Sequence, residues 1–215
     1  MRTMAKLSWV ELKLFVREPI TMVFTFAFPL IVLFVLAGVF GNTPDPRVFP
    51  RGVGPTDALV PAYIGVVIAS IGLIGLPVHL AGYRERGVLR RLRASSVSVW
   101  SVLGPQVVVS FVIAALGGVL LVTAASLAYD VHILKSAALL IAAFVLSTLS
   151  FAALGFFLGA VLPTARAAQG VGLLLFFVMM MLSGGGPPRA VMTRAMQWIG
   201  DAMPLRYVTI LLQDS

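Results

Sequence analysis

The sequence contains no cysteine and very little charge. The absence of cysteine from its 215 residues excludes disulfides, zinc–thiolate sites and iron–sulfur clusters. Only 11% of the residues are charged, against about 25% in a typical soluble domain. By contrast, 60% are hydrophobic and the mean hydropathy is +1.02. This composition is that of an integral membrane protein.

The phosphate-binding loop GxxxxGK is also missing. None of the lysines, Lys6, Lys13 and Lys135, follows a glycine, so the chain does not bind ATP through such a loop. The apolar runs hold no HExxH, GxSxG or paired-carboxylate arrangement, and enzyme chemistry within the membrane is therefore not expected. No catalytic, metal-binding or cofactor-binding residue is predicted in this chain.

Asp, Glu, Lys and Arg are absent from the apolar runs, although ion-coupled and proton-coupled pumps usually carry at least one of them at depth. His79 is the one candidate for a proton relay. A packing role is favoured for it because a relay would need a partner acid. A transport pathway without an energy source of its own indicates a partner that supplies one.

Five uncharged runs are long enough to cross a bilayer, which takes about 20 residues. Spans are expected at about 19–40, 58–82, 102–127, 136–162 and 167–182. Pro29 should kink the first span. Gly155 and Gly159 are spaced as GxxxG in the fourth, a hint of close helix packing. The sequence therefore predicts one all-α integral membrane domain over 1–215, a polytopic helical bundle.

Residues 1–18 predict an interfacial amphipathic helix, with a plain cytoplasmic lead-in as the alternative. Its cations share one arc, but Glu11 and Glu18 fall on the apolar side. A carboxylate there is costly against lipid, so these two residues are expected to face another protein element.

A helix break follows the fifth span. Residues 187–203 predict an amphipathic helix that is too short to span the membrane and is expected to be re-entrant on the external side. The glycines and prolines of the break end helices abruptly. The residues of the break are Ser183, Gly184, Gly185, Gly186, Pro187, Pro188 and Pro204.

The most basic part of the sequence is 83–93, YRERGVLRRLR, between the second and third spans. The positive-inside rule places it and the N-terminus in the cytoplasm, with 41–57, 130–135 and 183–215 outside. The apolar run that begins at 205 has no room to return, so a sixth span is expected to be missing. Anionic lipid headgroups explain the clustered cations better than nucleic acid does.

This basic stretch is either an orientation signal or a docking surface. On a helical wheel, Val88, Leu89 and Leu92 form an apolar ridge with Glu85, and arginines cover the other sides. An orientation signal needs no such ridge, so docking is favoured. The predicted docking residues are Arg84, Glu85, Arg86, Val88, Leu89, Arg90, Arg91, Leu92 and Arg93.

Together these features resemble the permease subunits of ABC-2 type ABC exporters, in particular the daunorubicin-resistance-type drug efflux permeases. The resemblance rests on Arg17-Glu18-Pro19 before the first span, the basic stretch 83–93, Gly155 with Gly159 and Pro163, Leu182-Ser183-Gly184-Gly185, and Met203-Pro204-Leu205-Arg206-Tyr207. It implies that 83–93 is the coupling helix, which contacts a cytoplasmic ATPase. It also implies that 187–203 is a re-entrant external helix before a sixth span.

The resemblance implies a transport subunit rather than an enzyme. Two copies of a P-loop ATPase subunit would carry ATP and Mg, and a second permease subunit would complete a homodimer or heterodimer in the inner (plasma) membrane. The cargo would be amphiphilic drugs or lipid-like molecules, with antibiotic efflux as the expected role. The alternative is an oligomeric channel or scaffold that needs no ATPase. A membrane-embedded lipid enzyme is disfavoured because no catalytic set is present.

Overall fold

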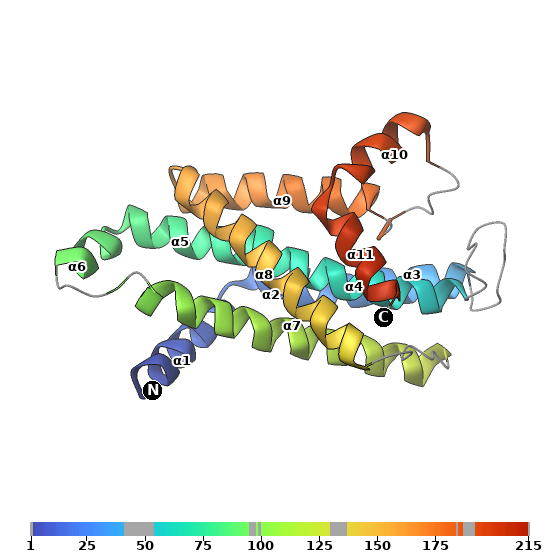
Figure 1. The fold of residues 1–215 in the computed structure, drawn as a ribbon, viewed down its shortest axis with the longest axis horizontal. Coiled ribbons are helices and arrows are strands. Elements are labelled where there is room, and N and C mark those ends of the chain that lie inside the picture. The colour runs from blue at the N-terminus through green and yellow to red at the C-terminus, as the bar shows by residue number, and fades with distance from the viewer. Residues whose placement is uncertain are drawn as a thin grey trace.

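The computed structural model describes residues 2–40, 54–94, 98, 100–129, 137–183, 185–186 and 192–214. Every regular element in these ranges is a helix (Figure 1). Five helical segments are long and apolar enough to cross a membrane, namely Pro19–Val39, Pro55–Glu85, Leu103–Tyr129, Ala138–Val161 and Ala165–Leu182. The predicted all-α, five-span fold is confirmed.

The first two spans are each built from three consecutive helical pieces, and the other three are single helices. The first comprises α2 (Pro19–Met22), η1 (Val23–Ala27) and α3 (Phe28–Phe40), and the second comprises α4 (Pro55–Ser70), η2 (Ile71–Gly75) and α5 (Leu76–Glu85). The others are α7 (Trp100–Tyr129), α8 (Ala137–Val161) and α9 (Ala165–Leu182). At 30 residues, α7 is longer than predicted, so it either tilts or extends beyond the hydrocarbon core.

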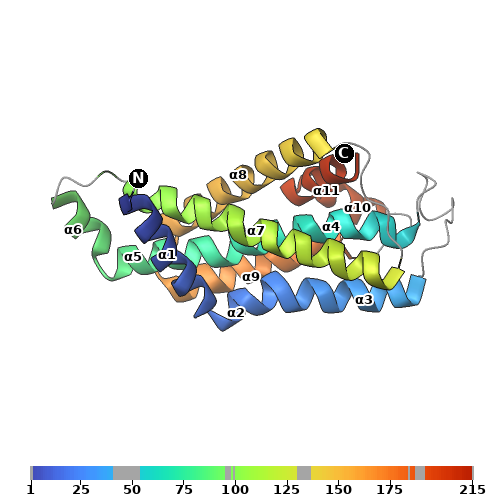
Figure 2. The ribbon, with the colours of Figure 1, turned by 90° about the horizontal axis from the view of Figure 1, so that it is seen from below.

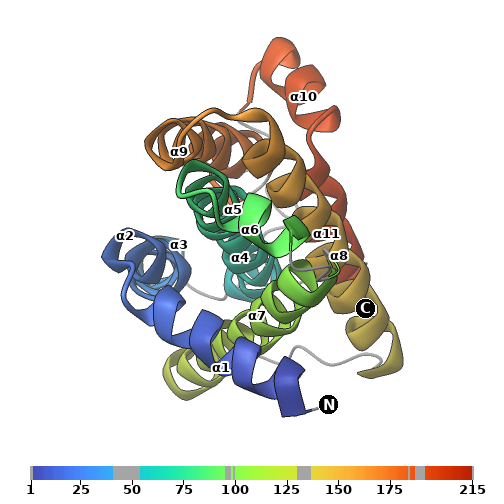
Figure 3. The same cartoon turned by 90° about the vertical axis from the view of Figure 1, so that its left-hand side faces the viewer.

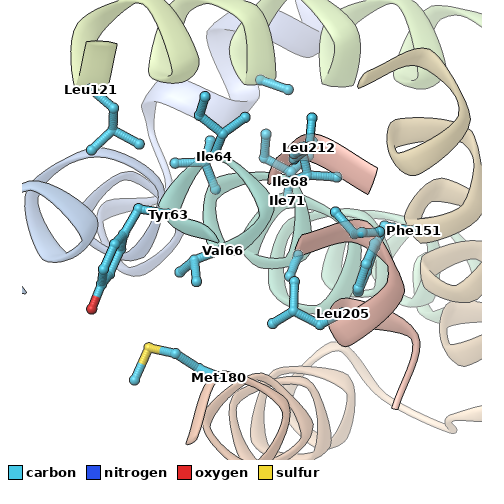
Figure 4. Packing of buried hydrophobic residues seen from close by; sticks show 14 of the residues in the cluster. Tyr63, Ile64, Val66, Ile68, Ile71, Leu121, Phe151, Met180, Leu205 and Leu212 are labelled. Carbon is cyan, nitrogen blue, oxygen red and sulfur yellow. The ribbon is translucent and has the colours of Figure 1, made fainter. Parts of the chain in front are cut away.

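The second span is the centre of the bundle. Its apolar window is 100% buried, whereas that of each other span is 28–39% buried. Figure 3 shows α4 and α5 surrounded by the other spans and by α11 (Pro204–Asp214). Tyr63, Ile64 and Ile68 of this span lie among Leu121, Phe151, Met180 and Leu205 from four different helices (Figure 4). A movement of this helix would therefore be felt by all its neighbours.

Glycines allow the second span to approach its neighbours at backbone distance. A Cβ added to Gly72 would lie 2.6 Å from the Phe151 carbonyl oxygen of α8, and one added to Gly155 would collide with the Gly72 carbonyl oxygen. A Cβ on Gly159 would lie 2.8 Å from Leu80 Cβ. The GxxxG spacing predicted close packing, and both of its glycines face the second span.

A π-helical turn precedes a proline in each of the first two spans. The Phe28 N–H bonds to the Val23 carbonyl just before Pro29, and Leu76 ends η2 in the same way just before Pro77. Proline has no N–H, and its ring crowds the carbonyl four residues earlier. The wider turn relieves that crowding, so a π-helical turn stands where the sequence predicts a kink at Pro29.

Different segments of the chain lie at the two ends of the bundle. One end, called here the basic end, carries the N-terminal helix α1 (Arg2–Val16), α6 (Val88–Ala94) and the corner between α8 and α9 (Figures 1 and 2). At the opposite end, Gln213 Nε2 donates a hydrogen bond of 2.9 Å to the Ala58 carbonyl. This arrangement agrees with the prediction that the N-terminus and 83–93 share one side of the membrane.

Candidate functional site at the basic end

The predicted coupling helix 83–93 is not one helix. The second span ends at Glu85. A turn of two residues, Arg86 and Gly87, follows, and α6 begins at Val88. Gly87 has φ 68°, in the left-handed region that favours glycine, and its N–H bonds to the Arg84 carbonyl at 3.0 Å. Such a glycine is a common way to end a helix. The prediction of a continuous helix was wrong because it took no account of this glycine.

Arg84 holds the end of the fourth span. Its Nη1 donates hydrogen bonds to the carbonyls of Gly159, at 2.8 Å, and Leu162, at 2.9 Å. These carbonyls belong to the C-terminal end of α8, where the free carbonyls and the helix dipole favour a cation. Arg84 therefore fastens the end of α5 to the end of α8.

Glu85 holds the start of the fifth span in a complementary way. Its Oε2 accepts a hydrogen bond of 3.2 Å from the Ala165 N–H, the first N–H of α9. A carboxylate is favourable at a helix N-terminus. The neighbouring Thr164 caps the same helix, accepting at Oγ1 from the Ala167 N–H at 3.1 Å. Arg84 and Glu85 thus make contacts within the chain, and their predicted contact with an ATPase stays a prediction.

The outer part of the basic stretch projects beyond the bundle. Arg86 donates through Nε to the Gly82 carbonyl, and Arg91 donates through Nη2 to the Arg86 carbonyl. Arg90 and Arg91 are exposed, whereas Val88 and Leu89 are half-buried. The side chains of Leu92 and Arg93 lie outside the described part of the structure. The described part of α6 therefore presents a half-buried apolar pair and two exposed guanidinium groups.

The N-terminal helix is attached to the same end of the second span. Tyr83 donates through its hydroxyl to Glu11 Oε1 at 2.7 Å, and Glu11 is 8% exposed. Glu18 Oε2 accepts from the Thr21 hydroxyl at 3.1 Å. The expectation that Glu11 and Glu18 face protein is confirmed.

His79 lies in this junction. Its Nδ1 is 2.9 Å from the Gly75 carbonyl oxygen, and its Nε2 is 3.7 Å from Glu18 Oε1. A local backbone bond is what a packing histidine makes. The acid at Nε2 was not foreseen, because the two residues are 61 positions apart, 79 minus 18. The structure therefore places Glu18, an acid of the kind that a proton relay would require, next to His79, for which a packing role was favoured.

A small cavity, whose lining is mostly apolar but includes four polar residues, lies between α1, α7 and the second span next to this junction. Glu11, His79, Gln106 and Ser110 line it, and its volume is ≈ 20 Å³, enough for about one water. Neither Gln106 Oε1 nor Gln106 Nε2 has a hydrogen-bond partner among the described residues. Because a buried amide without partners is costly, a bound water is the expected occupant.

The predicted break lies at the opposite end. The α9 helix ends at Leu182, and Ser183 donates its N–H to the Met179 carbonyl. The Gly185 carbonyl accepts a hydrogen bond of 2.7 Å from the Tyr63 hydroxyl. Gly186 is half-buried, and Gly184, Pro187 and Pro188 lie outside the described residues. The break is thus tied to the central span through Tyr63.

Beyond the break, one short helix lies within the predicted range 187–203, and a second covers the apolar run that begins at 205. These are α10 (Arg194–Asp201) and α11, with Pro204 at the first position of α11. A Cβ on Gly65, midway along α4, would touch Val208 and Leu205, whereas Gln213 reaches Ala58 near the start of α4. The α11 helix therefore runs from inside the bundle back towards its end. Pro204 starts a helix here, because its missing N–H is no loss at that position.

Comparison with known proteins identifies the family. A family model described as ABC-2 type transporter matches residues 4–215. The searches of curated proteins and of solved structures found no match. The match covers the N-terminal helix, all five spans and both short helices that follow them.

Proposed function

Because the chain belongs to the ABC-2 type transporter family, and so is a permease component of an ABC transporter with several membrane spans, we propose that it is the membrane subunit of an ATP-driven exporter. A separate ATPase subunit would hold ATP and Mg and hydrolyse the nucleotide. The family in general implies such a partner and a dimer in the membrane.

One observation carries this proposal, namely that α6 is joined to the central span by a two-residue turn. Arg90 and Arg91 of α6 are exposed beyond the bundle, while Arg84 and Glu85 hold the adjoining end of α5 against α8 and α9. A force applied to α6 would therefore reach the most buried helix of the bundle and two of its neighbours together. Such a connection suits a coupling element.

We propose that the basic end is cytoplasmic and that the membrane is the inner (plasma) membrane. The charge distribution supports this orientation, since Lys13, Arg17, Arg90 and Arg91 all lie in short segments at that end. Amphiphilic drugs or lipid-like molecules are proposed as cargo because the spans present apolar surfaces. Drug efflux, and with it antibiotic resistance, belongs to this proposal.

Copurification tests the proposal. A chain tagged at its N-terminus and purified gently from its native membranes should bring with it a stoichiometric P-loop ATPase. Purification of an oligomer with no ATPase would contradict the exporter and support the alternative, a channel or scaffold that needs no ATPase.

A charge reversal tests the coupling surface itself. Arg91→Glu should reduce ATPase stimulation by at least about tenfold, because reversing a charge in a close interfacial pair costs several kcal/mol. The matched control is Arg194→Glu, which reverses another exposed arginine, on α10 and far from the basic end. Full stimulation by the Arg91 variant would remove α6 as the docking element.

A further inference from the structure

A cavity of ≈ 680 Å³ opens at the basic end, between α6 and the spans. Helices α5, α6, α7 and α8 all contribute to its lining. Arg84, Glu85 and Arg90 supply the charged part, and Leu103, Phe156 and Phe157 are among the apolar residues. The cavity thus combines a cationic rim with an apolar wall.

The apolar wall belongs to the surface of a membrane span. Phe156 and Phe157 lie near the end of α8, and Phe157 is 63% exposed although its helix is among those that cross the membrane. An exposed aromatic residue on such a helix faces acyl chains rather than water. The cavity is therefore open to lipid along this wall.

The cationic rim lies at the level expected for lipid headgroups. Arg84 is close to the end of the second span, and Arg90 is in α6, just beyond it. The two hydrogen bonds from Arg84 to α8 use Nη1, and no described residue accepts a hydrogen bond from its Nε or Nη2. Glu85 is the acidic residue of the cavity lining, and its Oε2 accepts a hydrogen bond from the Ala165 N–H of α9. The rim therefore carries two guanidinium groups and one carboxylate that is already hydrogen-bonded, so its net charge is positive.

We propose that this cavity binds an anionic phospholipid, with the phosphate of its headgroup between Arg84 and Arg90 and its acyl chains along Phe156 and Phe157. Arginine is well suited to phosphate because its planar fork donates two parallel hydrogen bonds. The bound lipid would join α6 to α8, and so brace the coupling element against the bundle. Free phosphate shares the headgroup chemistry, but it would leave the aromatic wall and the lipid-facing opening without a role.

The test places a fluorescent reporter in the cavity wall. The natural tryptophans Trp9, Trp100 and Trp198 are 59%, 74% and 83% exposed, so each can be replaced by phenylalanine. Phe157→Trp then provides a single tryptophan in the full-length chain. The protein is reconstituted in phosphatidylcholine bilayers that contain a small fraction of lipid with brominated acyl chains, which quenches tryptophan on contact. Half-maximal quenching should need a mole fraction of brominated phosphatidylglycerol about fivefold or more below that of brominated phosphatidylcholine. The reason is that each nearby arginine raises the affinity for an anionic lipid by about fivefold.

Two arginine variants separate a specific site from a general attraction. Arg90→Gln should raise the phosphatidylglycerol fraction needed for half-maximal quenching about fivefold. Arg166→Gln removes another exposed cation at the same end that does not line the cavity, and it should leave this fraction unchanged. An equal shift in both variants would reduce the effect to non-specific surface charge and overturn the proposal.

The remaining outcomes also decide the matter. Equal quenching by the two brominated lipids in the parent chain would overturn the proposal. Loss of the phosphatidylglycerol preference in millimolar inorganic phosphate would assign the cavity to a soluble phosphate compound instead. No ATPase is needed for these measurements, so their outcome is independent of the proposed coupling partner.

Discussion

Tyr83 donates a hydrogen bond of 2.7 Å to the Glu11 carboxylate, which joins the end of the second span to the N-terminal helix. Glu11 is the one buried carboxylate among the described residues. Four residues earlier on α5, His79 lies 3.7 Å from Glu18. Glu11 in α1 and Glu18, two residues after α1 ends, thus both meet the same face of the central span. The helix is docked onto the bundle through these contacts.

Removal of the Tyr83 hydroxyl tests this attachment. Tyr83→Phe leaves a buried carboxylate without its donor, and we expect the free energy of unfolding to fall by about 1–3 kcal/mol. Thermal unfolding in detergent micelles measures the change. The control is Tyr207→Phe, which removes a hydroxyl that donates to a backbone carbonyl at a position 56% exposed. An equal loss in both variants would mean that the link between α1 and α5 has no special weight.

A pair of glycines on α9 tests the close packing of the central span. A Cβ at Gly172 would collide with the Leu73 carbonyl oxygen, whereas one at Gly170 would meet nothing within 4 Å. Gly172→Ala should destabilise the protein by about 3 kcal/mol, at the upper end for overpacking, because a backbone carbonyl in a helix cannot move aside. Gly170→Ala should be neutral or stabilising by up to about 1 kcal/mol, since alanine is the better helix former. Similar unfolding temperatures for the two variants would contradict this packing.

The turn before α6 can be tested through its backbone alone. No atom lies within 4 Å of a Cβ at Gly87, so any cost of substitution comes from its φ of 68°. Gly87→Ala should therefore cost about 1–2 kcal/mol, and Gly87→Asn less, because asparagine tolerates the left-handed region. Thermal unfolding measures this, and the unfolding temperature should be highest with glycine at position 87, lower with asparagine and lowest with alanine. Alanine as stable as glycine would mean that the turn can adopt another conformation.

The polar contact between the first two spans is a fourth test. Thr25 Oγ1 and Ser70 Oγ are 3.0 Å apart and both residues are fully buried; Thr25 lies within η1, and Ser70 immediately precedes η2. A double-mutant cycle with Thr25→Val and Ser70→Ala should give a coupling energy of about 0.6 kcal/mol, the usual value between membrane helices. The Ser70 hydroxyl also bonds to the Val67 carbonyl, which limits its loss in the Thr25 variant. A coupling energy of zero would show that this contact holds nothing together.

The sequence alone determined the membrane class, the five spans and the grouping of the basic segments at one end. These follow from composition and from runs of about 20 apolar residues, which the bilayer thickness requires whatever the tertiary packing is. The GxxxG spacing predicted close packing, but not that Gly155 and Gly159 would both meet the second span. The awkward position of Glu11 predicted a protein neighbour, but not which one.

The tertiary structure alone decided which distant residues of the chain contact one another. Arg84 and Glu85 belong to a stretch of charge whose pattern suggested docking. In the structure they hold the ends of α8 and α9, through hydrogen bonds to residues 75 or more positions later. Hydrophobic periodicity records which face of a helix is buried, but it carries no information on which distant helix end lies opposite a charge. The same limit applies to the cavity proposed to bind lipid, whose wall and rim come from four helices that meet only after folding.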